Sequence, residues 1–187
     1  AALVLTSAFT PMLFMGDEWG ARTPWMFFTD HREPELAEAI RRGRASEFGD
    51  HGWEELYGGP IEVPDPQARE TFERSRLDWS ELESPRHRRL FDWHRELIRL
   101  RRDEPDLASG DLDAVRVEHD PDGAWLVVHR GALRLAMVLD GSPAELELGP
   151  LADTTPLAAW PAADAASIAE DGRVTLPARS VTVLRTG

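Results

Sequence analysis

Two carboxylates and an indole, Asp17, Glu18 and Trp19, follow directly after an apolar run that ends at Gly16. Carboxylate oxygens accept hydrogen bonds from hydroxyl groups, and an indole offers a flat apolar face to a pyranose ring. A short buried strand that ends at a glycine can deliver such side chains to the mouth of a cleft. Residues 12–21 therefore favour the sugar-binding rim of a barrel, with a buried strand followed by a polar turn as the alternative.

Asp17 and Glu18 are not expected to form a catalytic pair, because neighbouring side chains of a strand point to opposite faces. We expect Glu18 to face the cleft, where it orients sugar hydroxyls or a catalytic partner, and Asp17 to have a structural role. Core packing and sugar stacking are comparable alternatives for Trp19 and Trp25. Stacking is favoured for Trp25, since this residue lies outside any periodic element. Weaker candidates for sugar contact, which loops more often use for packing, are Phe27, Phe28, Asp30 and His31.

The sequence lacks motifs for metal, phosphate or nucleotide binding. The six histidines do not show the His-Glu-x-x-His spacing, and residues 120–123 are better explained as a hairpin turn than as a calcium loop. No Gly-x-Ser-x-Gly elbow, phosphate loop or dinucleotide fingerprint occurs. We therefore expect neither a metal nor a cofactor.

The composition disfavours several classes of partner. A formal net charge of -13 argues against binding to nucleic acid or to anionic membranes, because either needs a basic surface. The chain has no cysteine, which excludes disulfides and thiolate metal sites and is consistent with the cytoplasm. The apolar residues 1–15 are too few to span a bilayer and are interrupted by Pro11.

The first half of the sequence predicts the end of an α/β barrel. Residues 1–8 read as a buried helix and residues 11–15 as a strand, which together form the helix–strand half of a repeating unit. Residues 22–80 form a long excursion rich in aromatic residues, of the kind that carries function. A helix over 35–48 interrupts it, and the prolines at 60, 64 and 66 predict an extended stretch.

A second amphipathic helix follows this excursion. Ser84 and Pro85 provide an N-cap and a first-turn proline, and apolar residues recur at helical spacing to about Arg102. The helix is expected to end near Pro105.

Short apolar runs separated by turn residues predict an antiparallel β-sandwich at the C-terminal end. The expected strands span residues 114–119, 124–130, 133–139, 144–148, 173–176 and 180–185. Residues 158–169 are rich in alanine and are expected to form a loop or a short helix. The predicted fold class is therefore α/β followed by all-β, with the C-terminal end of a (β/α)8 TIM barrel over residues 1–105 and an antiparallel β-sandwich domain over residues 106–187.

Several stretches together make a resemblance to a known family specific: Thr10–Ala21, Thr23-Pro24, Phe27–His31, Pro34–Leu36, Val63–Gln67, Thr71-Phe72 and Ser75–Trp79. On these residues the chain resembles the malto-oligosyltrehalose trehalohydrolases, a family of the α-amylase superfamily of (β/α)8 enzymes. The Gly-x-Glu strand end indicates the superfamily alone. The Phe-Phe-Thr-Asp-His stretch at 27–31 and the Val-Pro-Asp-Pro-Gln stretch at 63–67 narrow the resemblance to the trehalose-releasing branch.

This resemblance implies an architecture and an activity. Residues 1–8 would be the seventh barrel helix and residues 12–15 the eighth strand. The activity would be that of a retaining hydrolase that releases trehalose from malto-oligosyltrehalose by cleaving the α-1,4 bond next to the trehalose end. The family's three catalytic carboxylates lie on earlier strands. We therefore expect no catalytic residue in this chain and no activity of the chain alone.

The resemblance and the residue types together give the expected contacts. The expected partners are the malto-oligosaccharide or trehalose substrate and the N-terminal part of the barrel. The residues expected to contact substrate are Glu18, Trp19, Trp25, Phe28 and His31. Two alternatives remain: another α-glucan-acting enzyme of the superfamily, such as a branching or debranching enzyme, or a non-catalytic carbohydrate-binding module.

Overall fold

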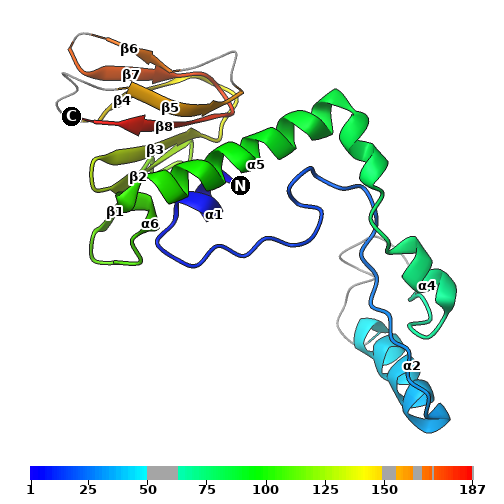
Figure 1. The fold of residues 1–187 in the computed structure, drawn as a ribbon. Helices are drawn as coiled ribbons and strands as arrows, with labels where there is room; N and C mark the ends of the chain where they lie inside the picture. The colour runs from blue at the N-terminus through cyan, green and yellow to red at the C-terminus, as the bar shows by residue number, and fades with distance from the viewer. Residues whose placement is uncertain (50–62, 149–154, 162–165, 170, 187) are drawn as a thin grey trace. The chain divides into compact units, whose positions relative to one another are not determined.

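The computed structural model describes residues 1–49, 63–148, 155–161, 166–169 and 171–186 (Figure 1). The chain divides into two compact units, one of Ala1–Trp19 with Pro85–Gly187 and the other of Gly20–Ser84. The boundary predicted between residues 105 and 106 falls inside the first unit. That boundary stays a prediction for the longer protein.

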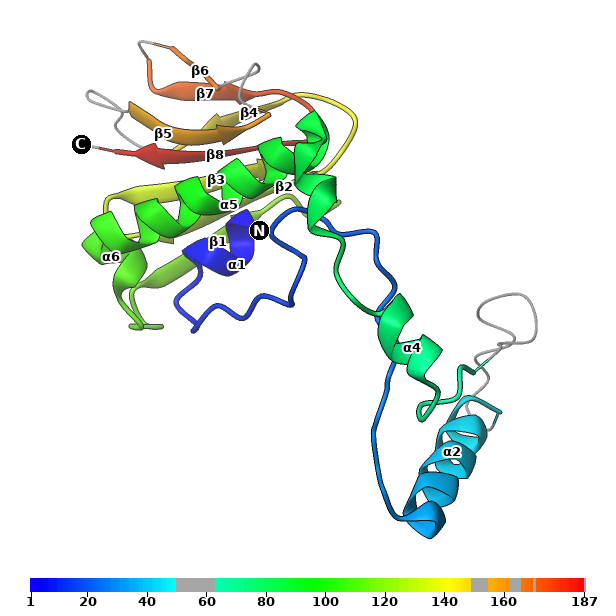
Figure 2. The same ribbon diagram turned by 45° about the vertical axis from the view of Figure 1, so that its right-hand side comes forward.

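The first unit contains two antiparallel sheets, which Figures 1 and 2 show stacked on each other. The larger sheet has the strand order β1 (Val115–His119), β2 (Trp125–Arg130), β3 (Leu133–Val138), β8 (Ser180–Arg185) and β5 (Thr155–Trp160). The smaller sheet has the order β4 (Ala144–Glu147), β7 (Arg173–Leu176) and β6 (Ser167–Ile168). All the strand pairs are antiparallel.

The strands predicted from short apolar runs between turn residues are confirmed as β1 to β4, β7 and β8. The prediction of a loop or short helix over residues 158–169 is wrong where β5 and β6 occur; residues 162–165 lie outside the described part of the chain. Alanine disfavours strands in isolation, but Ala158 and Ala159 pair with β8, and such tertiary pairing overrides a weak local preference.

Three helices cover one face of the larger sheet: α1 (Ala2–Thr6), α5 (Pro85–Asp103) and α6 (Pro105–Ala108) (Figure 2). The predicted helix over 85–102 is therefore confirmed, and the helix predicted over 1–8 is present in a shorter form. The buried face of α5, with Trp93, Leu97 and Leu100, packs with Leu5 of α1 and with apolar side chains of the sheet. The opposite face of the sheet packs against the smaller sheet through a second apolar cluster: Val127, Ala136, Val138, Leu146, Leu148, Val174, Leu176 and Leu184.

Two arginines bind the backbone that leaves α1. Arg101 of α5 donates to the carbonyl oxygens of Leu5 at 2.9 Å, Ser7 at 2.7 Å and Phe9 at 3.0 Å. Arg130 of β2, which is 2% exposed, donates to the carbonyl oxygen of Thr6 at 2.9 Å. The second terminal nitrogen of Arg130 donates to the carbonyl oxygens of two further residues, Asp106 at 2.7 Å and Ser109 at 2.6 Å.

The two hairpin turns that flank β2 differ in their surroundings. Gly123, at φ +79°, ends the turn between β1 and β2, and a Cβ atom added there would meet no atom within 4 Å. Gly131, at φ +55°, begins the two-residue turn between β2 and β3. A Cβ atom at this position would lie 2.2 Å from a carboxylate oxygen of Asp106, and that oxygen accepts a hydrogen bond from the backbone of Ala132 at 2.8 Å.

The strand predicted over residues 11–15 is wrong for this chain. Residues 11–14 form neither helix nor strand and belong to neither sheet, and Met12 is 89% exposed. Of this run, Leu13 alone packs against the apolar cluster between the helices and the larger sheet. A barrel strand forms only when its backbone groups pair with neighbouring strands. In the part of the chain that the structure describes, no strand lies beside this run.

The described part of the second unit contains α2 (Pro34–Gly49), α4 (Arg69–Arg74) and the 3-10 helix η1 (Trp79–Glu83). The helix predicted over 35–48 is confirmed as α2. The segment 22–31 runs antiparallel to the segment 66–81, because hydrogen bonds join residue pairs 22 and 81, 26 and 75, and 29 and 66. Pro60, in the predicted extended stretch, lies outside the described residues. None of the helices in the described segments combines the length and the apolarity that a membrane span requires.

A buried polar group lies on the face of the larger sheet that carries the second apolar cluster. The His129 ring of β2 has its Nε2 atom 3.0 Å from the carboxylate of Glu118 and its Nδ1 atom 3.1 Å from the guanidinium of Arg116. Burial lowers the pKa of His129, and the nearby guanidinium groups of Arg134 and Arg116 lower it further against the opposing effect of Glu118. His129 is thus held neutral in the folded chain at neutral pH.

Removal of the buried guanidinium of Arg130 should destabilise the first unit. Arg130→Met would remove the donor from the buried carbonyl oxygen of Thr6 and from the partly buried carbonyl oxygens of Asp106 and Ser109, so we expect the free energy of unfolding to fall by about 2–4 kcal/mol. Urea denaturation followed by tryptophan fluorescence measures the change. Arg95→Met is the matched control, because Arg95 is 70% exposed in its ion pair with Asp92 and should change stability by less than about 1 kcal/mol. Equal losses in the two variants would contradict the role of Arg130.

The lowered pKa of His129 predicts a dependence of stability on pH. The unfolded chain takes up a proton at about pH 6.5, whereas the folded chain does so only at lower pH. The stability that neutral His129 contributes is therefore complete above about pH 6.5 and is lost as the pH falls toward the folded-state pKa. We expect the difference in unfolding free energy between the wild type and His129→Gln to shrink across this interval. Parallel curves for the two proteins would exclude the effect.

Candidate substrate-binding site

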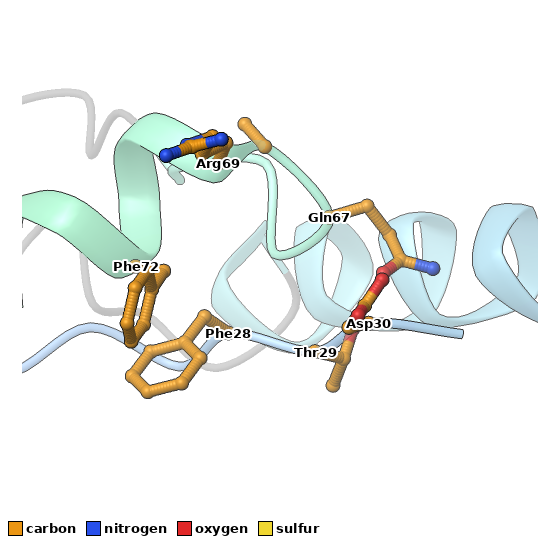
Figure 3. Close-up of a pocket in the computed structure, with 7 residues that line it drawn as sticks. Phe28, Thr29, Asp30, Gln67, Arg69 and Phe72 are labelled. Carbon is orange, nitrogen blue, oxygen red and sulfur yellow. The ribbon is translucent and has the colours of Figure 1, made fainter. Parts of the chain in front are cut away.

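The second unit contains a hollow of about 530 Å³ between the extended segment 28–30 and the start of α4 (Figure 3). Its walls combine two phenyl rings with polar and charged side chains. The residues that line it are Phe28, Thr29, Asp30, Gln67, Ala68, Arg69 and Phe72. This volume lies within the range of about 300–1,000 Å³ that is typical of small-molecule sites.

Two phenyl rings form the apolar part of the hollow. Phe28 and Phe72 meet edge to face, with ring centroids 5.2 Å apart and ring planes at 70° (Figure 3). Phe28 is 38% exposed and Phe72 is 46% exposed, so neither ring is buried in the interior of the unit. Exposed aromatic faces of this kind can stack on the apolar C–H face of a sugar ring.

The side chain of Gln67 links the two walls of the hollow through hydrogen bonds. Its carbonyl oxygen accepts hydrogen bonds from the hydroxyl of Thr29 at 3.2 Å and from the backbone N–H of His31 at 3.1 Å. Its amide nitrogen donates to the carbonyl of His31 at 3.3 Å, and the backbone N–H of Thr29 donates to Pro66 at 2.8 Å. Because both ends of the Gln67 side chain are engaged, this residue positions the wall and is a poor candidate for direct ligand contact.

The turn that precedes α4 is fixed by Asp65. The carboxylate of Asp65 accepts a hydrogen bond from the backbone of Gln67 at 2.9 Å and pairs with Arg41 at 3.1 Å. These two interactions, the first more than the second, hold the pKa of Asp65 below its usual value. The turn therefore keeps its anchoring charge at neutral pH, and Gln67 is presented at a defined point of the hollow.

Two charged residues, Arg69 and Asp30, line the hollow, and only Arg69 has an ionic partner among the described residues. Arg69 donates to Glu73 at 2.7 Å, one helical turn later, and this pairing raises the pKa of Arg69. Asp30 is exposed, and its side chain makes no ion pair among the described residues. Asp30 is thus available to accept hydrogen bonds from the hydroxyl groups of a neutral ligand.

The five residues expected to contact substrate divide between the two units. Phe28 lines the hollow of the second unit, as Figure 3 shows. The backbone of His31 is bound to Gln67, while its side chain is exposed and lies outside the lining. Trp25, in the same unit, is 58% exposed and is also not part of the lining.

Glu18 and Trp19 belong to the first unit. A carboxylate oxygen of Glu18 accepts a hydrogen bond from the backbone of Gly16 at 2.9 Å. Trp19 is 2% exposed, and its carbonyl oxygen lies 2.7 Å from Nδ1 of His87. The side chain of Trp19 is therefore buried and offers no open face to a sugar ring. The neighbouring Asp17 accepts a hydrogen bond from the backbone of Phe14 at 3.1 Å, which agrees with the structural role expected for it.

Sequence reasoning did not identify Gln67, Arg69 and Phe72 as site residues. Gln67 and Phe72 occur in two of the stretches that carry the family resemblance, but nothing in their local pattern marks them as site residues. The signal available was the position of Phe72 on the helix that follows the Pro-Asp-Pro-Gln turn. Groups of three or more histidine, aspartate or glutamate residues suited to a metal are absent from the described part of the chain.

Solved structures define the class of this fold. No family model matches the chain. The crystal structure of a Salmonella typhimurium protein described as an α-amylase matches with a TM-score of 0.73 and 33% identity. The match covers 99% of this chain and 30% of that chain. The trehalulose synthase of Pseudomonas mesoacidophila MX-45 matches with a TM-score of 0.58 and 15% identity over 100% of this chain and 37% of its own, a likeness of fold alone. The chain has the fold of part of an α-amylase-family enzyme, as predicted.

The curated relatives are malto-oligosyltrehalose trehalohydrolases. The Rhizobium sp. (strain M-11) protein is 44% identical over 185 residues, which cover 99% of this chain and 29% of that protein. The Arthrobacter ramosus protein is 50% identical over 143 residues, which cover 76% of this chain and 23% of that protein. The chain is therefore homologous to the C-terminal region of malto-oligosyltrehalose trehalohydrolases, which confirms the resemblance. It spans less than a third of the length of these relatives.

The hydrogen bonds of Gln67 predict a local effect on backbone protection. In Gln67→Met the N–H of His31 loses its acceptor, so its amide should exchange with solvent about 5- to 10-fold faster, as expected for one lost hydrogen bond. Hydrogen exchange read by NMR measures the rate for single amides. The N–H of Thr29, bonded to the backbone of Pro66, is the internal control and should change less. Equal acceleration at both amides would indicate that the substitution unfolds the whole segment.

Proposed function

We propose that this chain is the C-terminal part of a retaining glycoside hydrolase that releases trehalose from malto-oligosyltrehalose by cleaving the α-1,4 bond next to the trehalose end. The observation that carries the proposal is the 44% identity over 185 residues to the Rhizobium protein of that name. Identity at this level over almost the whole chain supports a shared role for the matched region. The preceding barrel strands of the complete protein would be the chain's main partner.

The hollow of the second unit is proposed to hold a glucose unit of the substrate. Phe28 and Phe72 would contact the apolar face of the ring, and Asp30 would accept hydrogen bonds from its hydroxyl groups. Trp25, at 58% exposure, is proposed to stack on a second sugar unit. Because Trp19 is buried, we assign its indole to packing, and its neighbour Glu18 keeps the proposed role of orienting sugar hydroxyls or a catalytic carboxylate.

Hydrolysis requires groups that the described hollow does not supply. Retaining cleavage uses two carboxyl groups about 5–5.5 Å apart on opposite sides of the scissile bond. Of the seven residues that line the hollow, Asp30 alone carries a carboxylate. The nucleophile and the acid are therefore proposed to come from the part of the protein that precedes this chain.

Kinetics of the complete protein test the proposal. Phe28→Ala and Trp25→Ala should each lower kcat/KM for trehalose release by about 5- to 150-fold, equivalent to about 1–3 kcal/mol of lost transition-state binding. Trp79→Ala is the matched control, since Trp79 is 64% exposed in the same unit and lies outside the lining of the hollow. Residues 1–187 alone should release no trehalose. Unchanged kcat/KM in both site variants would exclude the assignment of the hollow, and trehalose release by residues 1–187 alone would exclude an upstream catalytic centre.

A further inference from the structure

A second hollow, of about 300 Å³, lies between the two sheets of the first unit. Glu118 of β1, Trp125 and Val127 of β2, and the consecutive residues 145–148 of β4 and its C-terminal flank line it. The hollow plays no part in the proposed hydrolysis. Its volume is at the lower end of the range for small-molecule sites and suits one or two hexose units.

The floor of this hollow is apolar and carries one indole. Val127, Leu146 and Leu148 are at most 4% exposed and belong to the cluster between the sheets. Trp125 is half-buried, packs against the same cluster and contributes to the lining. An aromatic surface on a rigid strand is the element that stacks on a sugar ring.

The backbone of β4 adds hydrogen-bonding groups. β4 is the edge strand of the smaller sheet and pairs with β7 alone among the strands that the structure describes. An edge strand presents backbone N–H and C=O groups in alternation. A sugar hydroxyl can donate to one of these groups and accept from the other, which makes such an edge suitable for a neutral polyol.

The carboxylates of the hollow determine the charge of its ligand. Glu118 is engaged with Arg116 and His129, and Glu145 pairs with Arg173 at 2.8 Å. Glu147 makes no ion pair or side-chain hydrogen bond to any other described residue. The described lining contains three carboxylates and no lysine or arginine, which disfavours phosphorylated sugars and leaves the oxygens of Glu147 available to neutral hydroxyl groups.

We infer that this hollow is a second carbohydrate-binding site, which holds a neutral oligosaccharide through Trp125, Glu147 and the edge of β4. The ligand class follows from the indole, the available carboxylate and the backbone edge in one hollow. A peptide that added a strand to β4 is less favoured, because a four-residue edge offers few main-chain hydrogen bonds. The inference does not depend on the proposed hydrolysis.

Indole N–H resonances of the full 187-residue chain provide the test. Trp125→Phe assigns the Trp125 resonance, and maltotriose is then titrated into the wild-type chain. We expect a saturable shift of Trp125, a Kd that rises about 2- to 10-fold in Glu147→Gln through the loss of one charge-assisted hydrogen bond, and no shift with glucose 6-phosphate. Glu83→Gln is the matched control and should leave the Kd unchanged, because Glu83 is an exposed residue of η1 in the other unit.

Three results would overturn the inference. These are no shift of Trp125 with maltotriose, an unchanged Kd in Glu147→Gln, or a larger shift of Trp125 with an extended peptide than with maltotriose. The resonance of Trp25 reports separately on the sugar contact proposed for the second unit. A failure there leaves the result at Trp125 intact, so the two proposals are tested independently.

Discussion

The carbonyl groups at the end of α1 impose the constraint on which the first unit depends. A five-residue helix leaves its last carbonyl oxygens without partners inside the helix, and burial makes unpaired carbonyls costly. Arg101 and Arg130 supply the donors, and Arg130 also binds the carbonyls of Asp106 and Ser109. Because these donors come from α5 and β2, satisfying the carbonyls fixes the helices on the larger sheet and closes the apolar core beneath them.

The parts of the fold that could be predicted are those whose pattern is local. Leu97 and Leu100 recur at helical spacing, and short apolar runs bounded by turn residues mark β2 and β3, which are covered on both faces. The strand expected over residues 11–15 shows the limit of this reasoning. Its apolar pattern is that of a barrel strand, but a strand also needs neighbours, and the described chain provides none. β5 was missed for the opposite reason, since pairing with β8 imposes a conformation that its alanines do not favour.

The residues of the candidate site likewise fall into those that the sequence could predict and those that it could not. Phe28 could be predicted because an aromatic residue in a loop is visible in the sequence. Its partner Phe72 and the positioning residue Gln67 could not, because their contacts join segments separated by 36 residues or more in sequence. Trp19 illustrates the converse difficulty: an indole beside a carboxylate in sequence is indistinguishable from a sugar platform until its burial is known.

The turn between β2 and β3 has a consequence for altering this chain. A two-residue hairpin turn at a surface is ordinarily the safest place to insert a tag or a linker. Here the carboxylate of Asp106 occupies the space beside Gly131, and it also holds the backbone of Ala132. An insertion at this turn would therefore break the hydrogen bond between Ala132 and the Asp106 carboxylate, whereas at Gly123 an added Cβ atom would meet no atom within 4 Å, so the turn between β1 and β2 is the better place for a label or an added loop.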